Sequence, residues 1–117
     1  MKTLIIVNDA PYGSEKAYNA FRLVLTLQKE QADAELWIFL MADAVACALP
    51  GQKTPNGYYN LERMIKGMVN KGAQIKACGT CADARGLREV QFIEGVELST
   101  MSQLAQWVAD ADKVLTF

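Results

Sequence analysis

The sequence of 117 residues contains no histidine. A cysteine or serine nucleophile that relies on an imidazole base is therefore excluded, and with it the usual arrangement of a cysteine protease. A structural zinc site needs four ligands, usually two Cys-x-x-Cys pairs or one such pair with two histidines. Without histidine, only backbone amides and nearby cations remain to activate a thiol in this chain.

Neither sign of charge predominates, because 12 Lys and Arg face 13 Asp and Glu for a net charge of −1. The chain thus lacks the basic surface that nucleic acids and anionic membranes attract, and we expect neither as a partner. Long hydrophobic runs are also missing. The run Thr3–Val7 near the start is too short for a signal-peptide core or a membrane span. We therefore expect a cytoplasmic protein.

Cysteine is scarce and odd in number, with three residues in the chain. An odd set does not make a disulfide framework, and a reducing cytoplasm favours free thiols. Hydrophobic residues make up 51% of the sequence, which predicts a compact core. At this length we expect one domain spanning residues 1–117.

Apolar runs alternate with segments of helical periodicity along the chain. We predict strands at 3–7, 35–40, 73–78, 95–98 and 113–117. We predict a helix of about four turns after the cap Ser14, a short helix at 42–49, a helix from the cap Asn60 to Gly72, and a helix after Ser99 or Thr100. A long loop at 50–58 lies between two of these helices, and such loops usually have a function or form contacts.

This alternation predicts a doubly wound α/β domain with a mainly parallel sheet of about five strands. In a flavodoxin-like order, the strand at 3–7 lies beside the strand at 73–78, with the switch point between them. Ligands in such sheets gather beyond the carboxyl ends of the strands at that point. We therefore expect the loop at 8–14 to meet the loop that begins at Cys78.

The segment ACGTCADARG (77–86) holds a Cys-x-x-Cys pair directly after a predicted strand. Four interpretations compete: a redox dithiol, half of a zinc site shared between subunits, one reactive sulfur with a bystander, or two buried cysteines. At the strand end, amides of the following segment and Arg85 would favour a Cys78 thiolate. If that segment is helical, Cys81 and Arg85 lie on one face. Cys47, among alanines, is expected to be a packed apolar residue.

Four blocks of the sequence, NDAPYGSEKAYNAFRLVLTL, FLMADAV, CGTCADARG and GVELSTMSQLAQWVADADKVLTF, together resemble the DsrE/DsrF-like family of sulfur-relay proteins, in particular its small YchN-type members. The resemblance implies a DsrEFH-like fold, a homotrimer or homohexamer, and a thiol or persulfide carrier protein as partner. The family motif, a cysteine ending the third strand followed by Arg-Gly, matches Cys78, Arg85 and Gly86. By this resemblance Cys78 accepts sulfane sulfur as a persulfide and passes it to the next thiol.

Several site residues have two interpretations. Cys81 either resolves a Cys78 persulfide into a disulfide or simply packs. Asn8, Tyr12 and Ser14 either line the mouth of the Cys78 pocket, together with Gly86, or only shape a turn. We expect no cofactor and no metal. The alternatives to a sulfurtransferase-like carrier are a non-catalytic oligomeric module that binds a small ligand or partner, and a Cys78/Cys81 redox switch.

Overall fold

The computed structural model describes residues 1–117 as a five-stranded sheet with four α-helices and one 3-10 helix. In chain order the elements are β1 (Lys2–Val7), α1 (Lys16–Glu30), β2 (Glu35–Leu40), the 3-10 helix η1 (Ala42–Ala48), α2 (Leu61–Asn70), β3 (Gln74–Cys78), α3 (Gly79–Ala84), β4 (Val96–Ser99), α4 (Met101–Asp110) and β5 (Lys113–Thr116). All strand pairs are parallel. The predicted α/β fold with a parallel sheet is confirmed.

The order of strands across the sheet is β4-β3-β2-β1-β5. The expectation that β1 would lie beside β3 is wrong, because β2 pairs with both of them. Strands that follow one another in the chain often become neighbours in the sheet, as β1 to β4 do here. The order reverses between β1 and β5, where Asn8 donates two hydrogen bonds to the carbonyl oxygen of Phe117, from its backbone and from its side chain.

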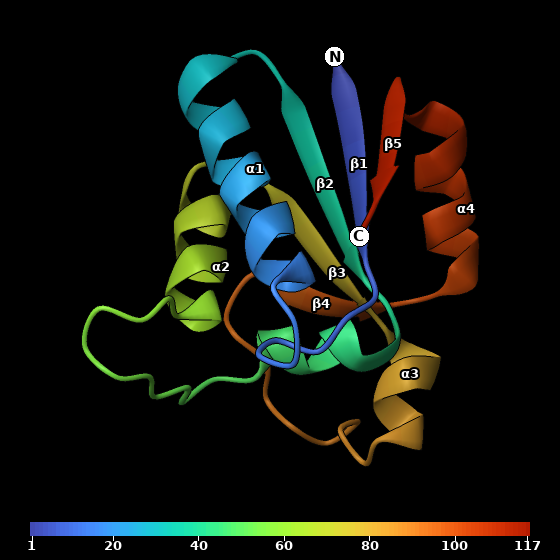
Figure 1. Cartoon of the computed structure of the whole chain (residues 1–117). Coiled ribbons are helices and arrows are strands. Elements are labelled where there is room, and N and C mark those ends of the chain that lie inside the picture. Colours follow the sequence, from blue (N-terminus) through green and yellow to red (C-terminus); the bar gives the residue numbers. More distant parts are fainter.

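Helices cover both faces of the sheet (Figure 1). Helices α1 and α2 lie side by side on one face, and α1 buries Phe21 and Val24 there. Helix α4 covers the other face, where Trp107 stacks on Trp37 of β2 at 5.3 Å between ring centroids. Strand β2 is therefore buried between the layers, whereas every residue of the edge strand β5 is exposed. No helix combines the length and the apolar character that crossing a membrane requires.

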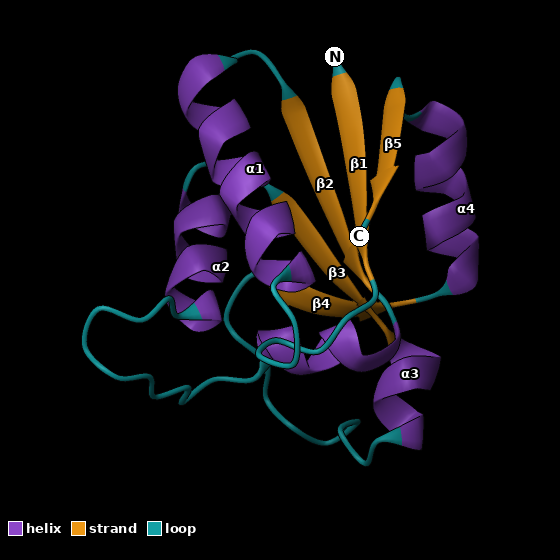
Figure 2. Cartoon of the chain, in the orientation of Figure 1, coloured by secondary structure: helices purple, strands orange, loops and turns teal.

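Two short helices, η1 and α3, lie at the carboxyl ends of the parallel strands (Figure 2). The segment 42–49 was predicted to be helical and forms the 3-10 helix η1. Asn60 caps α2 as predicted, because its side chain accepts the Arg63 N–H. Ser14 is not the cap of α1, which is Glu15; the Ser14 hydroxyl donates to Asp9 and accepts the Lys16 N–H.

Candidate functional site

Cys78 ends β3 and caps the first turn of α3. Its backbone is still extended, with φ −65° and ψ 118°, so the chain turns into the helix immediately after it. The Sγ atom accepts a hydrogen bond from the Cys81 N–H at 3.3 Å, as an N-cap side chain does. Only 7% of Cys78 is exposed. The sulfur is thus held in a fixed position by an amide at the end of a central strand.

Cys81 lies one helical turn further on and is half-buried. Its Sγ accepts a hydrogen bond from the backbone N–H of Ala42 at 3.2 Å. Ala42 is the first residue of η1 and has a φ of 50°, the one positive φ outside glycine in the chain. Residues other than glycine adopt this conformation only at a cost of about 1–2 kcal/mol. A strained peptide group is therefore directed at the second sulfur.

Arg85 lies near the thiol pair, at the end of α3. Its Nη1 donates to the Cys81 carbonyl oxygen at 3.0 Å, and its Nε and Nη2 each lie 2.9 Å from Oδ1 of Asp43. The guanidinium thus joins α3 to η1, in contact with backbone and carboxylate oxygens. Gly86 follows with a φ of 70° and ends the helical turn. Its place in the motif is explained by this left-handed conformation, which glycine adopts without strain.

Burial keeps the proton on two of the three thiols. It raises the pKa of Cys81 above its ordinary value, and the adjacent Cys78 side chain raises it further. The Ala42 amide and the Arg85 guanidinium oppose this rise in the Cys81 pKa without cancelling it. Burial also raises the pKa of Cys47 to about 12, which agrees with its expected place in the core. The Cys81 sulfur is therefore held in the protonated form.

The residues expected at the pocket mouth from the loop at 8–14 make their hydrogen bonds elsewhere. Asn8 bonds to Phe117 and Ser14 bonds to Asp9. The Tyr12 hydroxyl donates to Gln52 of the loop at 50–58 and accepts the Leu61 N–H at the start of α2. The prediction that this loop meets the loop after β3 at a switch point is wrong, because β2 lies between β1 and β3. The contribution of these side chains to a Cys78 pocket stays a prediction.

Sequence reasoning missed Ala42 and Asp43, which follow β2 and contact the segment after β3. The signal was present in the connections: β2 and β3 are consecutive strands, so the loop after β2 ends beside the loop after β3. A neighbouring ion pair joins Asp83 of α3 to Arg88, which follows the helix, and does not involve η1. The Arg88 guanidinium holds the pKa of Asp83 below its ordinary value.

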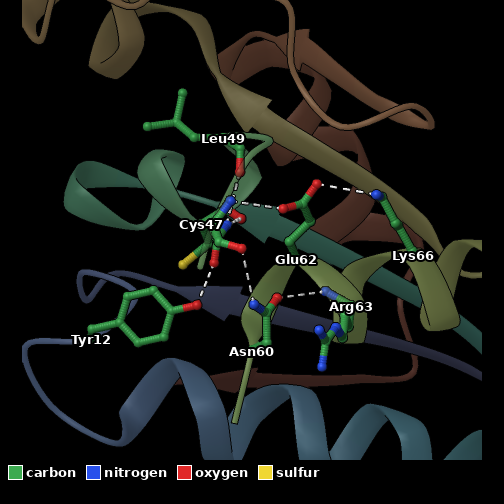
Figure 3. A network of polar contacts seen from close by, with 8 residues as sticks. Tyr12, Cys47, Leu49, Asn60, Glu62, Arg63 and Lys66 are labelled. Carbon is green, nitrogen blue, oxygen red and sulfur yellow. Dashed lines mark hydrogen bonds and ion pairs between the residues drawn. The ribbon is translucent and has the colours of Figure 1, made fainter. Parts of the chain in front are cut away.

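All four tyrosines of the chain form one stacked cluster beside the loop at 50–58. Gln52 fixes this loop: its side-chain amide donates to the carbonyl oxygens of Cys47 and Leu49, and its backbone N–H donates to Glu62. Figure 3 shows the network, with Asn60 and Tyr12 directed toward the same loop segment. The loop is therefore bound to the end of η1 and the start of α2.

Two cavities of the molecule are lined by residues other than Cys78 and Cys81. One, of about 660 Å³, lies between α1 and β5 at the opposite end of the strands, and includes Thr3, Leu27 and Lys113. A smaller one of about 200 Å³ lies between the starts of α3 and α4. No group of three or more cysteine or acidic side chains comes together that would hold a metal ion. The chemistry available at the end of β3 is that of the thiols and the amides around them.

Comparisons with known proteins place this geometry in a family. The profile of the DsrE/DsrF-like family matches residues 1–117. The protein YchN of Escherichia coli is 44% identical over 99% of this chain and 98% of its own length, and MJ0989 of Methanocaldococcus jannaschii is 41% identical over the whole of both. The crystal structure of YchN superposes with a TM-score of 0.95 and covers 100% of this chain and 99% of its own. The chain belongs to the DsrE/DsrF-like family.

Proposed function

We propose that this chain is a small sulfur carrier, similar to a sulfurtransferase, in which Cys78 accepts sulfane sulfur as a persulfide and passes it to a thiol of another carrier protein. The proposal is carried by the position of Cys78: a single sulfur at the carboxyl end of a central strand, held by the amide of the following helix. Membership of a family related to sulfur-relay proteins supports the same chemistry.

The proposed reaction needs no external oxidant or reductant. The Cys78 thiolate attacks the outer sulfur of a donor persulfide R-S-SH, a new S–S bond forms on Cys78, and the donor leaves as the thiolate RS⁻. An acceptor thiolate then attacks the outer sulfur on Cys78, takes it over, and releases the Cys78 thiolate. The amide on Cys78 Sγ stabilises negative charge on that sulfur before and after each transfer.

Mass measurement of the intact protein tests this function. After incubation with a small persulfide donor, the chain is expected to gain the mass of one sulfur atom. The gain should persist in Cys81→Ser and disappear in Cys78→Ser. Cys47→Ser serves as a control for a buried thiol outside the pair. Absence of an adduct in the unmodified chain would contradict the proposal.

A second candidate function, a thiol redox switch, is favoured by the contact between the backbone of Cys81 and the Cys78 sulfur, which brings two free thiols within one helical turn. Here a mild oxidant takes two electrons and two protons, and an S–S bond forms within the chain. The expected result is a mass loss of two hydrogen atoms that requires both cysteines. In a sulfur carrier, the persulfide gain requires only Cys78.

We also propose that the chain assembles into a homotrimer or homohexamer in the cytoplasm. Support comes from apolar side chains exposed along the edge strand β5, where Val114 and Leu115 are exposed by 41% and 39%. A second copy that covers them removes this surface from water. Light scattering should give a mass three or six times that of one chain. A monomer at micromolar concentration contradicts this assembly.

A further inference from the structure

Cys81 has no assigned role in the proposed sulfur transfer, yet its sulfur is more firmly positioned than a bystander requires. It accepts the Ala42 N–H, and its own backbone N–H donates to Cys78 Sγ. The lone pairs that face η1 are thus occupied by an amide. The S–H group of Cys81 remains free to donate, and the Cys78 Sγ atom lies 3.3 Å from the backbone nitrogen of Cys81 itself. The Cys78 side chain also contributes to the raised pKa of Cys81.

We infer that Cys81 is a hydrogen-bond donor to the Cys78 sulfur rather than a second nucleophile, and that Ala42, Asp43 and Arg85 are the positioning residues that hold it in this orientation. The inference rests on the proposed function, since it assigns Cys81 a part in stabilising the anionic sulfur of Cys78. With this donor, Cys78 receives two hydrogen bonds from one residue: the N–H and the S–H of Cys81. No covalent bond is made by Cys81 in this role.

The positioning residues form a clamp across the junction of η1 and α3. Arg85 contacts the Cys81 carbonyl oxygen with one nitrogen and the Asp43 carboxylate with two others. Asp43 directly follows Ala42, so the ion pair fixes the strained peptide group relative to the Cys81 sulfur. This geometry needs the planar fork of a guanidinium, because an ammonium group cannot make all three contacts at once.

The clamp changes what Arg85 is expected to do. A cation that acts only by its charge could be replaced by an ammonium group, in an Arg85→Lys variant, with little loss. A clamp that acts by geometry would be lost in Arg85→Lys and Arg85→Gln alike. The chain supplies a matched control in Arg88, which makes an ion pair with Asp83 on the same segment without touching η1 or either sulfur.

The test measures how fast iodoacetamide alkylates Cys78 and Cys81, with the sites separated by peptide mass mapping. No sulfur donor is present, so the result does not depend on persulfide formation. Cys81→Ser keeps a donor group and is expected to alkylate at Cys78 within about twofold of the unmodified chain. Cys81→Ala lacks the donor and is expected to react about tenfold more slowly at Cys78. Equal rates in the two variants would overturn the donor role.

The clamp is tested by the same assay at Cys81. Arg85→Lys, Arg85→Gln and Asp43→Asn are each expected to lower the alkylation rate of Cys81 several-fold, because the Ala42 amide, which lowers the Cys81 pKa, is no longer held on the sulfur and less of the thiol is ionised. Arg88→Gln is expected to stay within about twofold of the unmodified chain. A normal rate in Arg85→Lys, or an equal fall in Arg88→Gln, would overturn the clamp. Circular dichroism and thermal unfolding confirm that each variant is folded before its rate is compared.

The two proposals fail in different ways. Suppose the chain gains no sulfur from a persulfide donor, but Cys78 is alkylated faster in Cys81→Ser than in Cys81→Ala. The carrier function is then contradicted and the donor role of Cys81 is supported. If instead Cys78 gains sulfur but is alkylated at equal rates in both Cys81 variants, the carrier function is supported and the donor role of Cys81 is contradicted.

Discussion

The backbone N–H of Ala42 donates to the Sγ atom of Cys81 at 3.2 Å while Ala42 itself has a φ of 50°. The hydrogen bond and the strained backbone belong to the same residue. Strain of this kind persists where surrounding contacts determine the conformation, and here those contacts are the Cys81 sulfur and the Arg85 bridge to Asp43. The conformation thus links η1 to the end of β3 through a single peptide group.

Relief of this strain should stabilise the protein. Ala42→Gly keeps the N–H and is expected to raise the free energy of unfolding by about 1 kcal/mol in urea, because glycine adopts a positive φ freely. Ala48→Gly, at the buried end of the same 3-10 helix, is expected to lower that free energy by about 1 kcal/mol or more. Equal losses in both variants would show that Ala42 is not strained.

Gly95 precedes β4 in a position that a larger residue does not fit. It has a φ of 96°, and a Cβ atom there would lie 2.6 Å from Cγ1 of Val69. Gly95→Ala is expected to lower the free energy of unfolding by more than about 2 kcal/mol, since strain and overlap add. Gly57→Ala has a similar φ of 82° with open space around it, and we expect a loss of about 1 kcal/mol. Thermal and urea unfolding measure the loss of stability in each variant. Equal losses in Gly95→Ala and Gly57→Ala would show that the overlap with Val69 is relieved without cost.

Tyr12 is the tyrosine whose hydroxyl holds the loop at 50–58. It donates to Gln52 and accepts the Leu61 N–H at 3.1 Å. Tyr12→Phe should lower the free energy of unfolding by about 1–2 kcal/mol, because two partners lose a hydrogen bond. Tyr18→Phe keeps the ring stacking on Tyr59 and removes a hydroxyl with no such contacts, so its stability should change by less than about 0.5 kcal/mol. If Tyr12→Phe and Tyr18→Phe lower the free energy of unfolding by similar amounts, the hydrogen bonds of the Tyr12 hydroxyl are not the cause of the loss.

The buried thiol of Cys47 predicts an alkaline loss of stability. Its pKa is raised from an ordinary value of 9.0 to about 12 in the folded protein. Above pH 9 the unfolded thiol loses its proton while the folded one keeps it, so the unfolded state is increasingly favoured up to pH 12. Urea unfolding at about pH 8 and about pH 10 should show that the free energy of unfolding falls between the two pH values. This fall should be smaller in Cys47→Ala than in the unmodified chain, by up to about 1.4 kcal/mol per pH unit.

The pH comparison has an internal control. Cys47→Ala should be less stable than the unmodified chain at about pH 8, because a buried sulfur is replaced by a smaller group. The difference in free energy of unfolding between Cys47→Ala and the unmodified chain should then narrow as the pH rises. A gap that stays constant over this range would mean that Cys47 does not titrate on unfolding.

Much of the fold could be predicted from local patterns. Residues 36–40 of β2 are buried on both faces, and their apolar side chains indicate such a strand without further information. Asn60 predicted the start of α2 because a capping amide acts only on the residues next to it. The order of strands was not predictable in this way, since it depends on which crossover packs against which face.

The site was predictable in part for the same reason. Cys78 at the end of β3 follows from strand length and the Cys-x-x-Cys pattern, and Arg85 lies near it because both belong to one short segment. The contact of Ala42 with Cys81 joins positions 39 residues apart and depends on β2 being the neighbour of β3. Asp43 was missed because an exposed carboxylate in a short helix has no distinguishing pattern until its partner is placed.

The pairing of β1 with β5 has a consequence for synthesis of the chain. Thr3 faces Lys113 and Ile6 faces Thr116, so β1 receives its second neighbour only when residue 116 has been made. Until then one edge of β1 is unpaired, with the backbone groups of a buried strand open to other nascent chains. We expect the part from β1 to β4 to form early and to depend on chaperones until β5 pairs with it.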